Sequence, residues 1–467
     1  MWDFYESQLA ILAFFSIFFY GLDRKFSRKA NSKERPDNLE DGHVGHSDNV
    51  STLARKYLTV YAIVMGADWL QGPYVYSLYS EEYAFPERMV ALLFVTGFMS
   101  AALTAPLVGA WADQHGRRRL CMVFCVTYTI TCMCITVPSL PILFFGRVLG
   151  GVSTSILYSA FESWLVSSSN HLALPQSALS NILGRATLIN GIVAAIAGVV
   201  SNKLVSTTAT FKSPFIASGV LLVLAWVVIG RTWHENRGGA SSGDDGGIFQ
   251  LRRLGQAWNI VKTDPFLLVL GLTQTCFEGS MYLFVFVWVP TLQEATRTAT
   301  LPLGIIFSAF MLSMMIGSLL YTAIISNPPP TRPGQQGDSP LTVHAKLSSL
   351  VCATSALALA AGVSSPSEYV RFGAFCVFEA CVGMYYPVQG MLRGTLISDG
   401  HRATLSALFR VPLNVFVVAS LLTGVGSARN LVLSACSGIL GFSAIMTGLV
   451  IVRKASKASH SDSLRPA

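Results

Sequence analysis

The chain has 467 residues, of which 52% are hydrophobic and only 12% are charged. Soluble domains usually carry about 25% charged residues, so this composition excludes an ordinary soluble protein. The net charge of +8 does not indicate nucleic-acid binding, because the basic residues gather in loops on one side of the predicted membrane. The nine cysteines fall in or beside apolar segments, which predicts small buried side chains rather than a disulfide framework or a metal site.

Apolar segments long enough to cross a bilayer as helices recur along the whole chain. The first lies at 6–22, and the others form a twelve-segment core: 57–79, 88–111, 120–138, 141–166, 178–200, 214–231, 265–290, 302–325, 343–363, 369–390, 403–426 and 430–452. Asp3 and Glu6 precede the first segment and a basic run follows it. This is the charge profile of a signal anchor with its N-terminus outside.

Basic residues set the predicted orientation of the core. The basic runs before 57–79, after 88–111, in the middle loop and in the tail all fall on one side, which should be the cytosol. The chain then divides into an N-terminal transmembrane segment (1–23), a basic cytosolic linker (24–56), a six-helix half (57–232), a cytosolic middle loop (233–264), a second six-helix half (265–452) and a cytosolic tail (453–467).

The loop after the second core segment reads "GAWADQHGRRR". Its spacing resembles the G-x-x-x-D-x-x-G-R-[RK] loop motif of the major facilitator superfamily, and it stands in the expected place between core helices two and three. The alternative is a simple basic loop with a turn glycine. We interpret the motif as a gate, formed with an acid at the predicted cytosolic end of the fourth segment; its residues are Gly109, Asp113, Gly116, Arg117, Arg118 and Glu162.

A closer resemblance rests on several stretches: "ADWLQGPYVYSLY", "GRVLGGVSTSILYSAFESW", "FVFVWVPTL", "PLGIIFSAFM" and "FRVPLN". Together they resemble the molybdate-anion transporter family of the major facilitators, over most of the chain. The resemblance implies an all-α membrane protein with a twelve-helix core of two pseudo-symmetric six-helix halves, plus one extra N-terminal transmembrane segment. It also implies an oxyanion such as molybdate as substrate.

Ionisable side chains inside the apolar segments are the candidates for a substrate site. A charge in lipid is costly, so such a side chain normally faces a cavity or a partner. Asp68 and Glu278 lie near the middles of the first and seventh core segments, which are equivalent positions if the halves are related by a pseudo-twofold axis. Glu379 lies midway along the tenth segment, and Arg147 lies in the fourth.

An arginine and an asparagine recur in the fifth and eleventh core segments. "GRATLIN" contains Arg185 and Asn190, and "FRVPLN" contains Arg410 and Asn414. A spacing of four or five residues places both side chains roughly on one helical face. Two arginines, one from each half, would neutralise a tetrahedral dianion such as molybdate, and their planar guanidinium groups can grip its oxygens. The alternative is that each arginine pairs with an acid of the core.

The predicted substrate-binding residues are therefore Arg185, Arg410, Asn190, Asn414, Arg147, Asp68, Gln71, Tyr74, Glu278 and Glu379. For Asp68 two roles stay open: an ion pair with Arg185 or Arg147, or proton carriage from a buried position. Next to it, Gly72 and Pro73 predict a bend or break in the first core helix.

The predicted function is secondary transport of molybdate or a similar small oxyanion by alternating access, with protons an open choice of coupling ion. The sequence contains no P-loop, nucleophile–base pair or metal-ligand pattern, so ATP drive, enzymatic activity, cofactors and metals are not expected. The expected partners are the oxyanion and the lipid bilayer of the plasma membrane, without nucleic acid. The alternatives are a proton-coupled sugar or drug carrier, and a sensor or scaffold that keeps the fold without transport.

Overall fold

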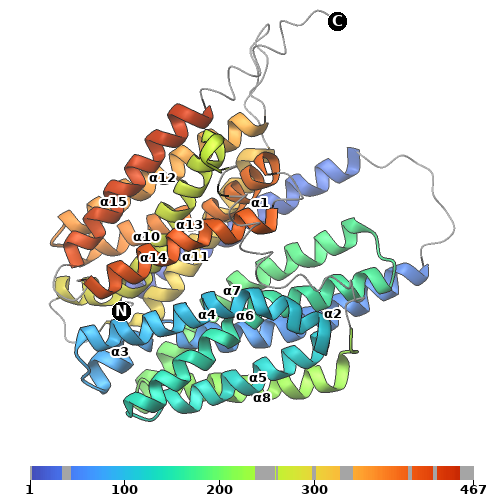
Figure 1. Ribbon diagram of the computed structural model, residues 1–467, viewed down its shortest axis with the longest axis horizontal. Coiled ribbons are helices and arrows are strands. Elements are labelled where there is room, and N and C mark those ends of the chain that lie inside the picture. The colour runs from blue at the N-terminus through green and yellow to red at the C-terminus, as the bar shows by residue number, and fades with distance from the viewer. Residues whose placement is uncertain are drawn as a thin grey trace, which may run out of the picture. The chain divides into compact units, whose positions relative to one another are not determined.

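The computed structural model describes residues 3–33, 44–236, 258, 261–296, 301–326, 340–397, 402–423 and 429–452. Within these residues the regular structure is entirely helical (Figure 1). This follows from the long apolar runs, because a segment in a bilayer must satisfy its backbone polar groups internally and a helix does so within one segment.

The helices before the middle loop are α1 (Phe4–Lys33), α2 (Val44–Gln71), α3 (Val75–Ser77), the π-helix η1 (Leu78–Glu82), α4 (Glu87–His115), α5 (Arg117–Ile135), α6 (Leu140–His171), α7 (Gln176–Thr208) and α8 (Ser213–Thr232). Those after it are α10 (Pro265–Ala295), α11 (Leu303–Ser326), α12 (Pro340–Ser364), α13 (Glu368–Leu396), α14 (Arg402–Thr423), α15 (Arg429–Met446) and the π-helix η3 (Thr447–Val452). The described part of every predicted apolar segment is mainly helical, so the all-α prediction is confirmed.

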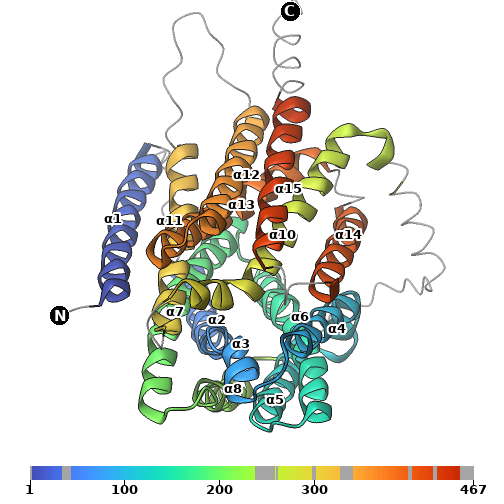
Figure 2. The ribbon, with the colours of Figure 1, turned by 90° about the vertical axis from the view of Figure 1, so that its left-hand side faces the viewer.

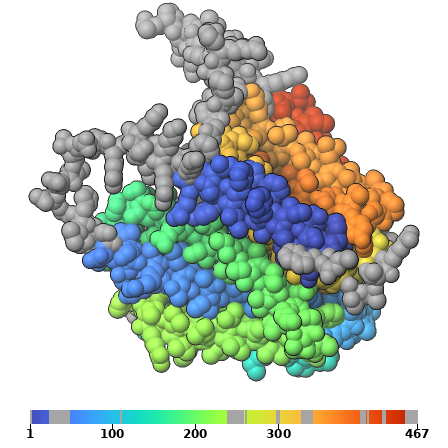
Figure 3. All heavy atoms as spheres, turned by 180° about the vertical axis from the view of Figure 1, so that it is seen from behind, coloured from blue at the N-terminus to red at the C-terminus, as the bar shows by residue number. Residues whose placement is uncertain are grey.

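Ten helices in the described part of the chain are long and apolar enough to cross a membrane. The core helices α2, α13 and α14 are not among the ten, and Leu408–Thr423 of α14 is a shorter apolar helix. Helices α2 and α13 carry acids of the predicted site, Asp68 near the end of α2 and Glu379 midway along α13. The extra helix α1, blue in Figure 3, is among the ten. Three of its phenylalanines, Phe14, Phe15 and Phe18, are exposed.

The chain forms two compact units. The first consists of Met1–Leu9, Ser32–Gly243 and Pro302–Met311, and the second of Ala10–Asn31, Asp244–Leu301 and Leu312–Ala467. Helix α11 therefore begins in the first unit and ends in the second.

In the first unit, α2 packs against α7 and α8, while α6 packs against α4 and α5 (Figures 1 and 2). The approach of α6 to α4 depends on Gly151, because a Cβ there would lie 2.5 Å from the backbone oxygen of Gly97. Small residues let membrane helices come this close. Gly151 belongs to the stretch after Arg147 that the sequence singled out.

In the second unit, α13 packs against α12 and α10, and α10 also packs against α14 and α15. Aromatic rings of α10 and α13 lie against one another. Phe277 lies parallel to Tyr385 with 3.9 Å between ring centroids, and Phe284 lies 4.9 Å from Phe378. This packing fixes the two helices that carry the acids of the second unit.

The predicted break in the first core helix is confirmed. Helix α2 ends at Gln71, and a turn over residues 72–74 leads into α3. Pro73 has no backbone N–H to continue the α-helical ladder. The amides of Gly72 and Tyr74 instead bond three residues back, to Trp69 and Gln71. The break comes just after Asp68, so this acid lies in the last turn of α2.

Candidate functional site

Asp68 of α2 is bonded by a phenol rather than by an arginine. The hydroxyl of Tyr128 on α5 donates to Asp68 Oδ1 over 2.6 Å. Among the described residues Asp68 has no ion pair. Arg147, one of the two predicted partners, donates from Nε to the carbonyl of Leu93 over 3.0 Å. Arg147 therefore joins α6 to α4 and is not a partner of Asp68.

Gln71 and Tyr74 hold helices of the first unit together. Gln71 is buried, and its Nε2 donates to Ser218 Oγ on α8 over 2.8 Å. Tyr74 is 3% exposed, and its hydroxyl donates to Asn202 Oδ1 on α7 over 3.0 Å. The Tyr74 hydroxyl also accepts from the amide of Gly304, 3.4 Å away. These contacts give both residues a structural role in this conformation.

Asn190 on α7 is bonded to the residue after Asp68. The indole Nε1 of Trp69 donates to Asn190 Oδ1 over 2.8 Å, and both side chains are half-buried. Arg185, five residues earlier on α7, is exposed and has no hydrogen bond or ion pair with any described residue. Five residues correspond to about 140° around a helix, so α7 by itself does not place Arg185 and Asn190 on one stripe.

Glu278 on α10 lies at the centre of a polar cluster in the second unit. Its Oε1 pairs with Arg393 Nη2 of α13 at 3.1 Å, with the two side chains 13% and 27% exposed. The same oxygen accepts from the Tyr385 hydroxyl at 3.2 Å, and Oε2 accepts from Gln274 Nε2 at 3.3 Å. The charge of Glu278 is thus balanced within its own unit.

The remaining predicted residues of the second unit have no bonded partners among the described residues. Glu379 on α13 is only 6% exposed, yet it forms no hydrogen bond or ion pair within the described chain. Arg410 on α14 is exposed and equally unbonded within that part, as is the half-buried Asn414. Arg410 and Asn414 are four residues apart, about 40° around the helix, so they do share a face.

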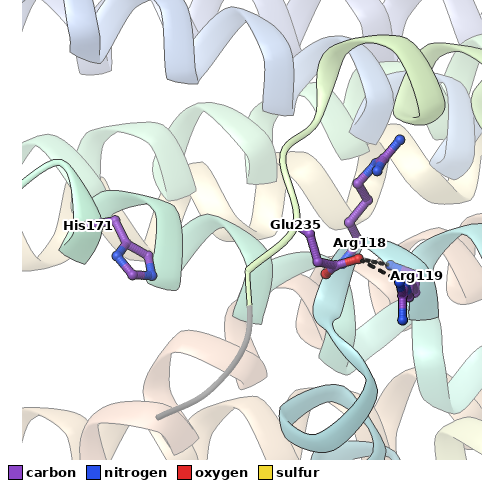
Figure 4. Close-up of a pocket in the computed structure, with 4 residues that line it drawn as sticks. All are labelled: Arg118, Arg119, His171 and Glu235. Atoms are coloured by element: carbon purple, nitrogen blue, oxygen red, sulfur yellow. Dashed lines mark hydrogen bonds and ion pairs between the residues drawn. The ribbon is translucent and has the colours of Figure 1, made fainter.

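The motif loop is built around Gly116 and Glu235, an acid outside the predicted gate residues. Gly116 has φ +97°, a conformation that favours glycine. The Glu235 carboxylate lies against it and accepts from the amides of Arg118 and Arg119 over 3.0 and 3.2 Å (Figure 4). It therefore satisfies free N–H groups at the start of α5, where the helix dipole favours an anion.

The structure describes the contacts of three further predicted gate residues, Arg117, Arg118 and Glu162. Arg118 donates to the carbonyl of Gly230 over 2.7 Å. The Arg117 amide donates to the carbonyl of Asn236 over 3.0 Å. Glu162 is exposed and forms no hydrogen bond or ion pair with the described part of the loop; Glu235 makes the contact expected of it. The side chains of Gly109 and Asp113 lie outside the described residues.

The start of the predicted middle loop, Trp233–Asn236, is an ordered part of the first unit. Trp233 is 3% exposed and stacks on Trp164 of α6 with 3.7 Å between ring centroids. Trp164 Nε1 donates to the carbonyl of His234, and Asn236 Nδ2 donates to Ser168 Oγ over 2.6 Å. This segment, which we call the loop clip, places Glu235 beside α5.

Three residues that bond the predicted site or gate were not predicted from the sequence. Tyr128 bonds Asp68, Arg393 bonds Glu278, and Glu235 bonds the motif loop. Arg393 offered a signal, because it is a charged side chain that follows Tyr385 and Gln389 on one helical stripe. Trp233 also offered one, since a tryptophan is unusual at the start of a solvated loop. Tyr128 offered none, because a tyrosine in an apolar helix is as often a packing residue as a hydrogen-bond donor.

Comparison with known proteins adds the family. A family profile described as "Sugar-transporters, 12 TM" matches residues 14–331. The molybdate-anion transporter of Xenopus tropicalis is 34% identical over 371 residues, covering 78% of this chain and 77% of the relative. That of Takifugu rubripes is 32% identical over 387 residues, covering 78% of both chains. The chain belongs to the molybdate-anion transporter family.

Solved structures agree on the fold of this family member. The POT family transporter PepTSo superposes with a TM-score of 0.67 at 11% identity, over 87% of this chain and 98% of its own. The nucleoside transporter NupG does so with a TM-score of 0.61 at 12% identity, over 87% of this chain and 98% of its own. The protein is thus a multi-pass transporter of the major facilitator type, and its relatives are transporters rather than enzymes.

Proposed function

We propose that this transporter carries molybdate or a similar small oxyanion by alternating access. The observation that supports the proposal most is the state of two arginines. Arg185 and Arg410 are exposed and unbonded within the described chain, whereas the acids that could have paired with them, Asp68 and Glu278, bind Tyr128 and Arg393. Two cations without protein counter-charges suit a dianionic ligand.

Arginine is the residue best suited to this task. Its guanidinium group stays charged, and its planar set of N–H donors can bind two oxygens of one anion. In the proposal Arg185 and Arg410 each supply charge and donors, with further N–H groups from Asn190 and Asn414. The names of the relatives support the same substrate class, whereas the matching family profile is described by sugars.

We also propose protons as the coupling ion. Within the described residues, neither Asp68 nor the buried Glu379 has a cation beside it. If both acids were ionised, they would cancel the charge of the two arginines and leave nothing to attract a dianion. Protonation of these carboxyls would restore the net positive charge, so that protons and oxyanion bind and travel together.

Uptake by the purified protein in liposomes tests the proposed substrate. Tagged molybdate would be offered with sulfate or a sugar as competitor, and parallel uptake by intact cells would test the proposed plasma-membrane location. We expect saturable molybdate uptake that sulfate inhibits and sugars do not. Inhibition by sugars alone, or no uptake by protein shown to be folded, would refute the oxyanion proposal in favour of a sugar carrier or a non-transporting protein.

A further inference from the structure

The hydrogen bond between Trp69 and Asn190 fixes which end of the asparagine amide can meet a ligand. An indole N–H can only donate, so the atom that it contacts at 2.8 Å must be the carbonyl oxygen Oδ1. The amide nitrogen of Asn190 has no hydrogen-bond partner among the described residues. Its two N–H donors therefore remain available on a half-buried side chain.

Trp69 is itself held in place by packing. Its ring lies 5.9 Å from that of Phe307, centroid to centroid, within the same unit. The neighbouring carboxylate on α2, that of Asp68, bonds to Tyr128 on α5, whereas Trp69 and Asn190 join α2 to α7. The amide oxygen thus faces the indole, and the N–H donors are the end of the amide without a partner among the described residues.

A side chain that presents only hydrogen-bond donors to the substrate favours oxyanions without a proton, because every oxygen of such an anion can accept. Near neutral pH, molybdate and sulfate carry no proton, so all of their oxygens accept hydrogen bonds. Phosphate carries at least one O–H, which must find an acceptor or lose its hydrogen bond on binding. An unpaired polar group in a desolvated site is costly, and selectivity built this way is strong.

We propose that Trp69 is a positioning residue that sets oxyanion selectivity, by holding the Asn190 amide with its N–H donors toward the substrate and its oxygen away. The transporter then prefers fully deprotonated tetrahedral dianions over hydrogen phosphate. This inference rests on the proposed oxyanion function and adds a residue pair and a selectivity rule to it. Removing the indole N–H would free the amide to rotate and offer its oxygen to an O–H.

The test compares dissociation constants for molybdate and inorganic phosphate on purified full-length protein near neutral pH. Trp69→Phe keeps an aromatic ring but removes the indole N–H. We expect the preference for molybdate over phosphate to fall about tenfold. Asn190→Asp keeps an oxygen for Trp69 and replaces the donors by a carboxylate oxygen, so it should lower the same preference by at least as much. Trp226→Phe, at an exposed position on α8, is the matched control and should leave it unchanged.

The outcomes separate this inference from the proposed function. Wild-type protein that binds molybdate, with the same preference in both site variants, would overturn the role of Trp69 and leave oxyanion transport standing. An equal fall in Trp226→Phe would also overturn it, as a general effect of losing an indole. Wild-type protein that binds neither anion would refute the proposed function and the inference together. If Trp69→Phe does not fold, Asn190→Asp alone decides.

Discussion

The two acids that the sequence predicts to be equivalent in the two halves, Asp68 and Glu278, are bonded in different ways. Glu278 has a cation, a phenol and an amide around it: Arg393 at 3.1 Å, Tyr385 at 3.2 Å and Gln274 at 3.3 Å. Asp68 has one described hydrogen bond, from Tyr128 at 2.6 Å. Glu278 thus has a cation beside it, whereas no cation bonds to Asp68 among the described residues.

The difference indicates that pseudo-symmetric positions have separate tasks. Glu278 and Arg393 neutralise each other and tie α10 to α13, which makes the pair a structural element of the second unit. Asp68 has no ion pair among the described residues, so its protonation would break none. In our proposal, the acid of the second half therefore has a structural role and the acid of the first half carries the proton.

The largest expected effect comes from removing the cation of the second half. Arg393→Ala would leave Glu278, only 13% exposed, without a counter-charge. Breaking a buried pair in this way costs about 3 kcal/mol, so thermal unfolding in detergent should show a large loss of stability. Glu278→Gln combined with Arg393→Ala should recover part of the loss, because the uncompensated charge is gone. Equal stability of single and double variants would contradict the pairing role.

Substitution of Arg185 and Arg410, which have no hydrogen bond or ion pair among the described residues, tests the proposed substrate site. Arg185→Lys and Arg410→Lys keep the charge but lose the planar donor group. Each should weaken molybdate binding by roughly tenfold to a hundredfold, the equivalent of a lost charge-assisted hydrogen bond of about 1.5–3 kcal/mol. Arg88→Lys, at an exposed position near the start of α4, is the control. If both site variants bind molybdate like the parent, the proposed roles of Arg185 and Arg410 are wrong.

The hydroxyl groups of Tyr128 and Tyr385 should contribute differently to stability, because the acids that they bond have different numbers of other partners. Tyr128→Phe removes the one described hydrogen bond of Asp68 and should lower the free energy of unfolding by about 1 kcal/mol. Tyr385→Phe should cost less than half as much, since Arg393 and Gln274 still bond to Glu278. The comparison uses matched thermal unfolding of the two variants. A larger loss of unfolding free energy in Tyr385→Phe than in Tyr128→Phe would contradict our view that Asp68 depends more on its phenol than Glu278 does.

A small effect on stability is also expected at the motif loop. Glu235→Gln removes the charge that caps α5 but keeps one amide oxygen, so the loss should be about 0.5–1 kcal/mol. Transport should slow while molybdate affinity stays at the parent value, because Glu235 contacts the loop and not the proposed substrate residues. The variant of choice as a control is Glu162→Gln, whose side chain is exposed and unbonded to the described loop. A loss of affinity in Glu235→Gln would contradict a gating role.

Helix positions could be predicted from the sequence because long apolar runs in a bilayer have few alternatives. The break after Gln71 was equally predictable, since proline cannot continue the hydrogen-bond ladder. The equivalence of Asp68 and Glu278 in the two halves stays a prediction from the repeat. Their partners could not be predicted, because a pattern of spacing says which residues share a face and not which helix lies opposite.

The loop clip shows a second limit of the sequence. Trp233–Asn236 precedes a stretch rich in glycine and serine, so the whole region was assigned to a polar loop. The contacts that order it come from Trp164, Ser168 and the start of α5, all more than sixty residues away along the chain. Long-range contacts of this kind leave little trace in local composition.

The most direct test of the central claim is accumulation of molybdate by liposomes that contain the purified transporter, with and without an imposed proton gradient. The account predicts that the wild-type protein accumulates molybdate only when the gradient is present. Asp68→Asn should still exchange internal for external molybdate but should no longer accumulate it. Wild-type accumulation that ignores the gradient, or Asp68→Asn protein that accumulates molybdate like the parent, would contradict the assignment of proton exchange to Asp68.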